Sequence, residues 1–120
     1  MTKRILIVED DQFLSDLYRT KLQSFGYETL VARDGEEALK LIVEKDLALI
    51  LLDLLLPKMS GFAVLENVGK LAKNTPPVIV LSNLSQKEEV EKGLKLGADE
   101  YFVKANFTPQ EVVDKIRSKI

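Results

Sequence analysis

The sequence predicts an α/β fold in which a five-stranded parallel sheet is covered by helices on both faces. Short aliphatic runs recur along the chain, and the segments between them carry the periodicity of amphipathic helices. Strands that alternate with helices in this way pair in parallel through right-handed crossovers, which gives a doubly wound, three-layer domain. With 120 residues and 46% hydrophobic content, the chain is large enough for one core, and we expect a single domain over residues 1–120.

The five predicted strands are short and largely apolar. Residues 5–8, 47–52 and 78–81 are almost wholly aliphatic, which is typical of strands that are buried on both faces of a sheet. Residues 27–32 and 100–103 complete the set.

Capping residues mark the starts of three predicted helices. In each, a side chain that can cap a helix stands three residues before a glutamate: Asp34 with Glu37, Ser85 with Glu88, and Thr108 with Glu111. Pro109 suits the first turn of the last helix. The apolar spacing from Phe13 to Phe25 predicts a further helix, and we expect its Tyr18 and Phe25 to lie in the core.

The composition excludes several classes of function. The net charge is −2 and the Lys and Arg residues are scattered, so we expect no direct binding to nucleic acid. The absence of cysteine and histidine excludes thiolate metal sites and hydrolysis by a histidine triad. No apolar run could span a bilayer and no cleavage signal is evident, so we expect a cytoplasmic protein without membrane contacts. We find no linker sequence and expect no attached output domain.

Polar side chains follow the predicted strands at the edge where an open α/β sheet binds its ligands. The residues concerned are Glu9, Asp10 and Asp11 after the first strand, Asp53 after the third, Ser82 and Asn83 after the fourth, and Lys104 after the fifth. Converging carboxylates repel each other, and a hard cation such as Mg²⁺ relieves that repulsion. A lysine and a hydroxyl nearby suit the oxygens of a transferring phosphoryl group, so Asp53 is the expected acceptor.

Each of these residues also has a structural interpretation. Asp11 could simply cap the helix that follows it, because carboxylates favour helix N-termini. Asp53 could be a turn residue, Ser82 a cap at a strand end, and Lys104 a solvated charge. For each residue taken singly, the structural interpretation explains its position as well as the functional one does. The placement of all of them at the strand ends favours a functional site.

Three segments resemble the receiver domain of two-component signalling proteins. Residues 5–11, with Glu9 and Asp10, resemble its first strand and acid pair; residues 52–61, with Asp53, resemble its phosphoacceptor loop; and residues 97–104, ending at Lys104, resemble its switch strand. The resemblance covers essentially the whole chain. It implies a flavodoxin-like sheet with strand order 2-1-3-4-5 and five helices on its two faces.

The resemblance also implies a cofactor, partners and residue roles. The implied Mg²⁺ ligands are Glu9 through a water molecule, Asp10, Asp53 and the backbone carbonyl of Leu55. The implied phosphoryl contacts are Ser82 and Lys104, and the implied switch residues are Ser82 and Tyr101. A histidine kinase or histidine phosphotransfer protein would donate the phosphoryl group. The face of the fourth helix, fifth strand and last helix would bind an unknown downstream protein.

Two positions depart from the family pattern. Ala105 follows Lys104 where the family usually has a proline in a cis peptide, and a cis bond without proline costs about 2.5–4 kcal/mol. Asn83 stands where a small residue is usual, so its amide either crowds the phosphoryl site or adds a hydrogen-bond donor to it.

Two other functions compete with a phosphoacceptor switch that catalyses only its own phosphorylation and dephosphorylation. A phosphatase of the haloacid dehalogenase type would need a second aspartate two positions after Asp53, where this chain has Leu55. A scaffold that works without phosphate would have no use for the retained charged residues. The resemblance further implies that Leu55 and Leu84 overhang the phosphoryl group. Because neither side chain can orient a water molecule, we expect slow hydrolysis.

Overall fold

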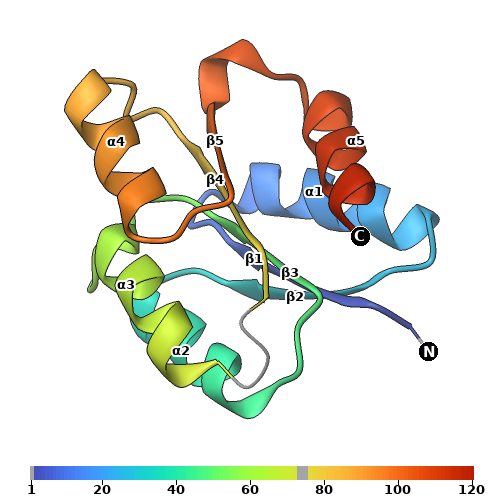
Figure 1. Ribbon diagram of the computed structural model, residues 1–120. Helices are drawn as coiled ribbons and strands as arrows, with labels where there is room; N and C mark the ends of the chain where they lie inside the picture. The colour runs from blue at the N-terminus through green and yellow to red at the C-terminus, as the bar shows by residue number, and fades with distance from the viewer. Residues whose placement is uncertain (1, 73–75) are drawn as a thin grey trace.

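A computed structural model describes residues 2–72 and 76–120, and within them the chain forms one parallel sheet (Figure 1). Its strands are β1 (Arg4–Val8), β2 (Glu28–Ala32), β3 (Leu49–Leu52), β4 (Val78–Ser82) and β5 (Glu100–Val103). Their order across the sheet is β2-β1-β3-β4-β5, as the family resemblance implies. The third strand is shorter than the predicted one at its amino end, and the fourth includes Ser82.

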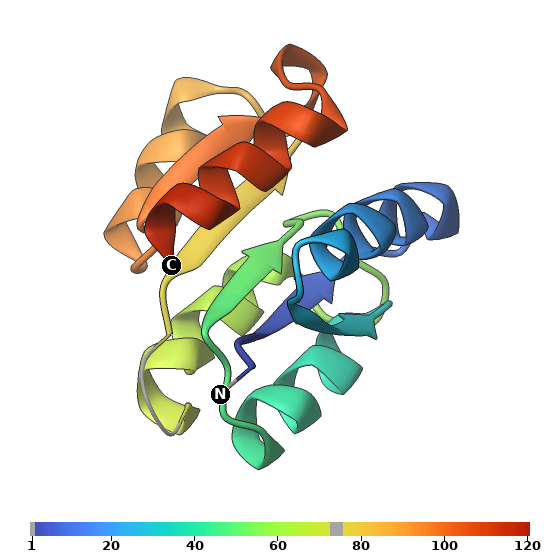
Figure 2. The same cartoon turned by 90° about the vertical axis from the view of Figure 1, so that its right-hand side faces the viewer.

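Helices cover both faces of this sheet, which confirms the three-layer prediction. They are α1 (Gln12–Ser24), α2 (Gly35–Glu44), α3 (Gly61–Leu71), α4 (Lys87–Lys95) and α5 (Pro109–Lys119), with a short 3₁₀ turn η1 (Lys104–Asn106) after β5. α1 and α5 lie on one face, and α2, α3 and α4 lie on the other (Figures 1 and 2). None of the helices in the described part of the chain is long and apolar enough to cross a membrane.

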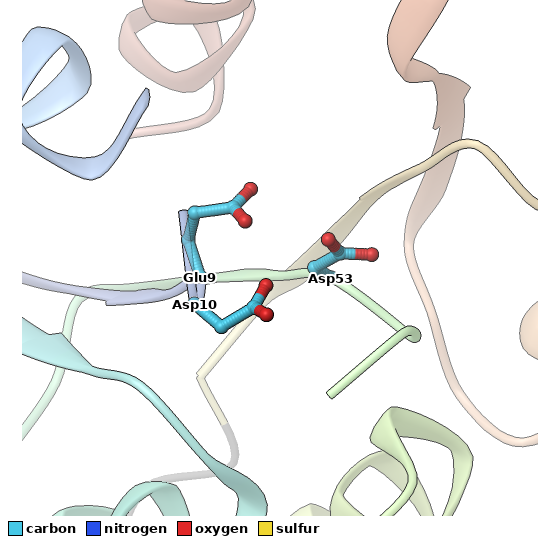
Figure 3. Close-up of side chains that lie close together, drawn as sticks. All are labelled: Glu9, Asp10 and Asp53. Carbon is cyan, nitrogen blue, oxygen red and sulfur yellow. The ribbon is translucent and has the colours of Figure 1, made fainter. Parts of the chain in front are cut away.

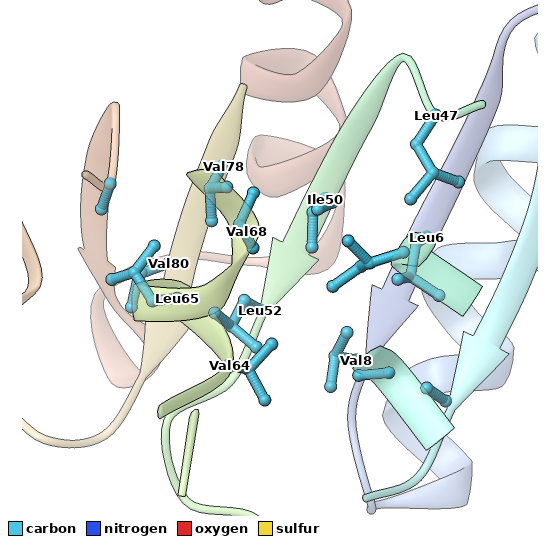
Figure 4. Packing of buried hydrophobic residues seen from close by; sticks show 14 of the residues in the cluster. Leu6, Val8, Leu47, Ile50, Leu52, Val64, Leu65, Val68, Val78 and Val80 are labelled. Atoms are coloured by element: carbon cyan, nitrogen blue, oxygen red, sulfur yellow. The ribbon is translucent and has the colours of Figure 1, made fainter. Parts of the chain in front are cut away.

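The sheet divides the buried side chains into two clusters. One includes Leu6, Ile50 and Val80 from the strands and packs against side chains of α2 and α3 (Figure 4). The other includes Ile7 and Leu51 and packs under α1 and α5. Alternate residues of β1 and β3 therefore point into different clusters, as the pleat of a strand requires. This explains why these strands are aliphatic at every position.

The helix caps agree with the sequence at two of three predicted starts. The Asp34 carboxylate accepts a hydrogen bond from the Glu37 N–H at 2.8 Å, and the Thr108 hydroxyl accepts one from the Glu111 N–H at 3.2 Å. The prediction for Ser85 is wrong, because α4 starts one residue later. There Gln86 is the capping position, and its N–H donates to the Glu89 carboxylate at 3.0 Å.

Helix α1 confirms one core prediction and contradicts another. Tyr18 is buried, as expected, against the cluster under α1 and α5. Phe25 is not in the core: it follows the last turn of α1, is 44% exposed, and stacks under the Arg117 guanidinium at 3.7 Å. Phe13, in the first turn of the same helix, is 72% exposed.

Candidate functional site

The ends of β1 and β3 bring two acidic residues side by side. Val8 pairs with Leu52 in the parallel register, and the pairing continues one residue beyond each strand. The Asp53 N–H donates to the Val8 carbonyl at 3.0 Å, and the Glu9 N–H donates to the Ala32 carbonyl at 3.0 Å. The backbone positions of Glu9 and Asp53 are therefore set by the sheet itself.

Three carboxylates gather at this edge of the sheet (Figure 3). Glu9, Asp10 and Asp53 each offer an oxygen atom, and these atoms lie within 4.8 Å of one another. Glu9 is 3% exposed and Asp53 is 5% exposed, whereas Asp10 faces solvent. A group of oxygen donors with one open side fits a hard cation that keeps part of its hydration shell, such as Mg²⁺. Desolvation by burial raises the pKa of Glu9, which a bound cation would counteract.

Lys104 supplies a positive charge to the two buried carboxylates. Its ammonium nitrogen lies 2.5 Å from a Glu9 oxygen and 2.8 Å from the Asp53 Oδ2 atom. Burial by itself lowers the pKa of Lys104, but hydrogen bonds to Asp53 and Glu9 outweigh this effect, so its pKa is raised. Lys104 is therefore a firmly charged group in contact with the predicted phosphoryl acceptor.

This contact is made without a cis peptide after Lys104. No peptide bond between described residues is cis, so the Lys104–Ala105 bond is trans. The chain turns through η1 instead, and Lys104 is the first residue of that turn. Lys104 thus reaches Asp53 and Glu9 from a turn in which all peptide bonds are trans.

The loop after β3 is held close to the backbone of Asp53. The Leu55 N–H donates to the Asp53 Oδ1 atom at 3.1 Å, and the Gly61 N–H donates to the Leu54 carbonyl at 3.0 Å. A Cβ atom on Gly61 would lie 2.4 Å from the Asp53 carbonyl oxygen, so this approach requires glycine. Gly61 entered the sequence analysis only as the last residue of the segment 52–61. A glycine that begins a helix directly after a serine cap is the signal that could have indicated this close backbone contact. The Leu55 carbonyl as a metal ligand stays a prediction.

Ser82 and Tyr101 are connected through the backbone of Leu84. Ser82 is fully buried at the end of β4, and its hydroxyl accepts a hydrogen bond from the Leu84 N–H at 3.4 Å. The Tyr101 hydroxyl donates to the Leu84 carbonyl at 2.5 Å, and burial raises the pKa of Tyr101. The two predicted switch residues are thus joined by a single residue.

The remaining candidates at the strand ends have other surroundings. Asp11 caps α1, accepting from the Leu14 N–H at 3.1 Å, so its structural interpretation is the one observed. Asn83 is exposed and lines a groove of about 250 Å³ between α1 and the loop after β5. That groove is also lined by Leu14, Tyr18, Lys104, Ala105, Phe107 and Pro109.

Comparison with known proteins identifies the family. The sequence pattern of the response regulator receiver domain matches residues 5–117. The chain belongs to this family. A receiver domain protein from Methanospirillum hungatei, 34% identical, superposes with a TM-score of 0.91 over 99% of this chain and 94% of its own.

Curated relatives of this receiver domain are longer proteins. The probable transcriptional regulator ycf27 of Porphyridium aerugineum is 37% identical over 116 residues, which are 97% of this chain and 47% of that protein. The alkaline phosphatase synthesis transcriptional regulatory protein PhoP of Bacillus subtilis is 36% identical over 118 residues, 98% of this chain and 48% of that protein. The receiver therefore spans about half the length of these relatives.

Replacing the neighbouring acids Asp10 and Asp11 by alanine should have opposite effects on stability without Mg²⁺. Asp10→Ala should raise the melting temperature, because the change removes one of three close carboxylates and no hydrogen bond of Asp10 is found within the described residues. Asp11→Ala should lower the stability by about 1 kcal/mol, because it removes the cap of α1. Thermal unfolding in EDTA measures both. A loss of stability in Asp10→Ala would mean that this residue has a structural role.

Replacing Lys104 by methionine should destabilise the metal-free protein by about 3 kcal/mol at neutral pH. The change leaves the buried carboxylates of Glu9 and Asp53 without their positive partner. Mg²⁺ should restore part of the loss, since it supplies a cation to the same oxygens. Chemical unfolding with and without Mg²⁺ measures this recovery. The surface variant Lys87→Met is the control and should change little, because its ion pair with Glu91 is exposed.

Proposed function

We propose that this receiver accepts a phosphoryl group on Asp53, from a histidine kinase or a histidine phosphotransfer protein, in a Mg²⁺-dependent reaction. The observation that supports this most is the contact of Lys104 with a buried aspartate that lies beside two further carboxylates. This arrangement provides an acceptor, a cation for the phosphoryl oxygens and ligands for a metal in one place. The protein acts as a phosphoacceptor switch, and the only reactions it catalyses are its own phosphorylation and dephosphorylation.

In the transfer step, an oxygen of the Asp53 carboxylate forms a bond to the phosphorus atom of a phosphohistidine. The phosphorus–nitrogen bond breaks, and its electron pair returns to the imidazole nitrogen of the donor. Lys104 then exchanges a carboxylate oxygen for a phosphoryl oxygen, and the Ser82 hydroxyl turns toward another. A magnesium ion held by Glu9, Asp10, Asp53 and the Leu55 carbonyl would neutralise charge on the phosphoryl oxygens.

The surface near Lys104 offers the phosphoryl donor apolar contacts. The groove that Leu14, Ala105 and Phe107 line lies directly beside Lys104. Phe13, in the first turn of α1, presents a largely exposed ring. On the output side, we propose that phosphorylation changes the face of α4, β5 and α5, where Tyr101 lies, for a downstream protein partner.

Acetyl phosphate with Mg²⁺ should add one phosphoryl group to the intact protein. Asp53→Asn should show no adduct, because an amide oxygen cannot replace the attacking carboxylate. Asp11→Asn is the matched control and should still be phosphorylated, because Asp11 caps α1 and lies outside the carboxylate group. Intact-mass measurement gives the result, and an adduct that persists in Asp53→Asn would contradict the proposal.

The phosphorylated receiver should be long-lived, with Leu55 as the main shield against water. Leu55 is 53% exposed, whereas Leu84 is partly buried and packs against the core, so we assign Leu84 a smaller shielding role than Leu55. Leu55→Asn should speed hydrolysis on the order of tenfold, equal to ~1.4 kcal/mol of barrier, because its amide can orient a water molecule. Phosphate release at saturating Mg²⁺ measures the rate. Leu55→Met is the control that keeps an apolar side chain, and equal rates for all three proteins would exclude shielding by Leu55.

A further inference from the structure

Gly93 lies near the carboxyl end of α4, at a position where any side chain would meet Tyr101. The residue is buried, and a Cβ atom built on it would lie 2.9 Å and 3.0 Å from two carbon atoms of the Tyr101 ring. Glycine inside a helix is less stable than alanine there, so its presence in α4 calls for a physical reason. The close approach of the ring supplies one.

The position of the ring matters because of the hydroxyl at its far end. With the ring against Gly93, the Tyr101 hydroxyl donates to the Leu84 carbonyl. The Leu84 N–H donates to the hydroxyl of Ser82, which is fully buried at the end of β4. A tyrosine displaced from α4 would lose the Leu84 contact, and with it the connection to Ser82.

We propose that Gly93 is a positioning residue that makes room for Tyr101 against α4, so that Leu84 links Ser82 to the tyrosine. The proposal rests on the switch function proposed above. It adds that Gly93 on α4 determines the position of the switch residue Tyr101. A side chain at position 93 shifts the resting position of Tyr101 away from α4. Glycine at position 93 leaves room for the inward position of Tyr101, in which the ring lies against α4 and the hydroxyl contacts the Leu84 carbonyl.

Gly69 is a matched control for this assignment. It lies inside α3, and a Cβ atom built on it would meet nothing within 4 Å. Alanine at either glycine should favour its helix by a similar amount, because the same backbone entropy is removed from the unfolded chain. A difference between the two alanine variants therefore includes the contact with Tyr101, and removing the Tyr101 ring isolates that contact.

The first experiment is a double-mutant cycle on the unphosphorylated protein. Gly69→Ala should raise the melting temperature by a few degrees, whereas Gly93→Ala should raise it less or lower it. In a Tyr101→Val background, where the ring is absent, Gly93→Ala should stabilise as much as Gly69→Ala does. Equal effects of the two alanines in the wild-type background would overturn the proposal.

The second experiment follows the Tyr101 ring directly. In protein labelled with ¹³C-tyrosine, Gly93→Ala should move the Tyr101 ring resonances toward solvent-exposed values and leave those of Tyr18 and Tyr27 unchanged. Tyr101→Phe, which lacks the hydroxyl, identifies the resonances and shows the effect of losing the Leu84 bond. Unchanged Tyr101 resonances in Gly93→Ala would overturn the proposal.

Phosphorylation separates this proposal from the proposed function. With acetyl phosphate and Mg²⁺, Gly93→Ala should still gain one phosphoryl group, because Gly93 does not contact the carboxylate site. After phosphorylation, the ratio of inward to outward Tyr101 should fall about fivefold relative to wild type, the factor in an equilibrium constant that the net stability of one hydrogen bond gives. An inward tyrosine in both phosphorylated proteins would reject the role of Gly93, and failure of the wild type to be phosphorylated would reject the proposed function.

Discussion

The structure depends on the electrostatic balance at the carboxyl edge of the sheet. Parallel pairing of β1 and β3 places Glu9 and Asp53 next to each other, and both are almost fully buried. Two carboxylates in such a place repel each other and lose their hydration. The Lys104 ammonium contacts both carboxylates, and its positive charge offsets their repulsion and so stabilises the metal-free fold.

The lysine makes its contact with Asp53 across the end of a neighbouring strand. β4 lies between β3 and β5 in the sheet, so Lys104 must reach across the end of β4 to contact Asp53. Ser82 ends β4 and pairs with Val103, the residue before Lys104. Ser82 therefore stands at the end of the strand that separates Lys104 from Asp53.

Much of this arrangement could be predicted from the sequence, because it follows from periodicity and from the edge of the sheet. The strand order, the two covered faces and the clustering of Glu9, Asp10 and Asp53 required only the ends of apolar runs and the family resemblance. The ion pair of Glu9 with Lys104 was not predicted, because the family resemblance assigns Glu9 to the metal and Lys104 to the phosphoryl group. Phe25 was misplaced because helical spacing alone does not show where a helix ends.

The role of Gly93 was also beyond the sequence. A glycine inside a helical pattern lowers the helix propensity of that segment. Only the structure shows that the Tyr101 ring packs against this glycine. The path of the chain after Lys104 could not be predicted either. Alanine at position 105 disfavours the cis peptide that is usual in the family, but it does not predict the 3₁₀ turn η1. Both features arise from tertiary contacts made by a single residue.

The division of the core by the sheet bears on how such sequences can diverge. Side chains under α1 and α5 do not share a cluster with those under α2 and α3, so the backbone of the sheet stands between them. Free-energy changes of substitutions in separate clusters are expected to add, whereas substitutions within one cluster must compensate each other. Each half of the molecule can therefore accumulate replacements on its own. This independence fits the observation that the Methanospirillum hungatei protein keeps the same architecture at 34% identity.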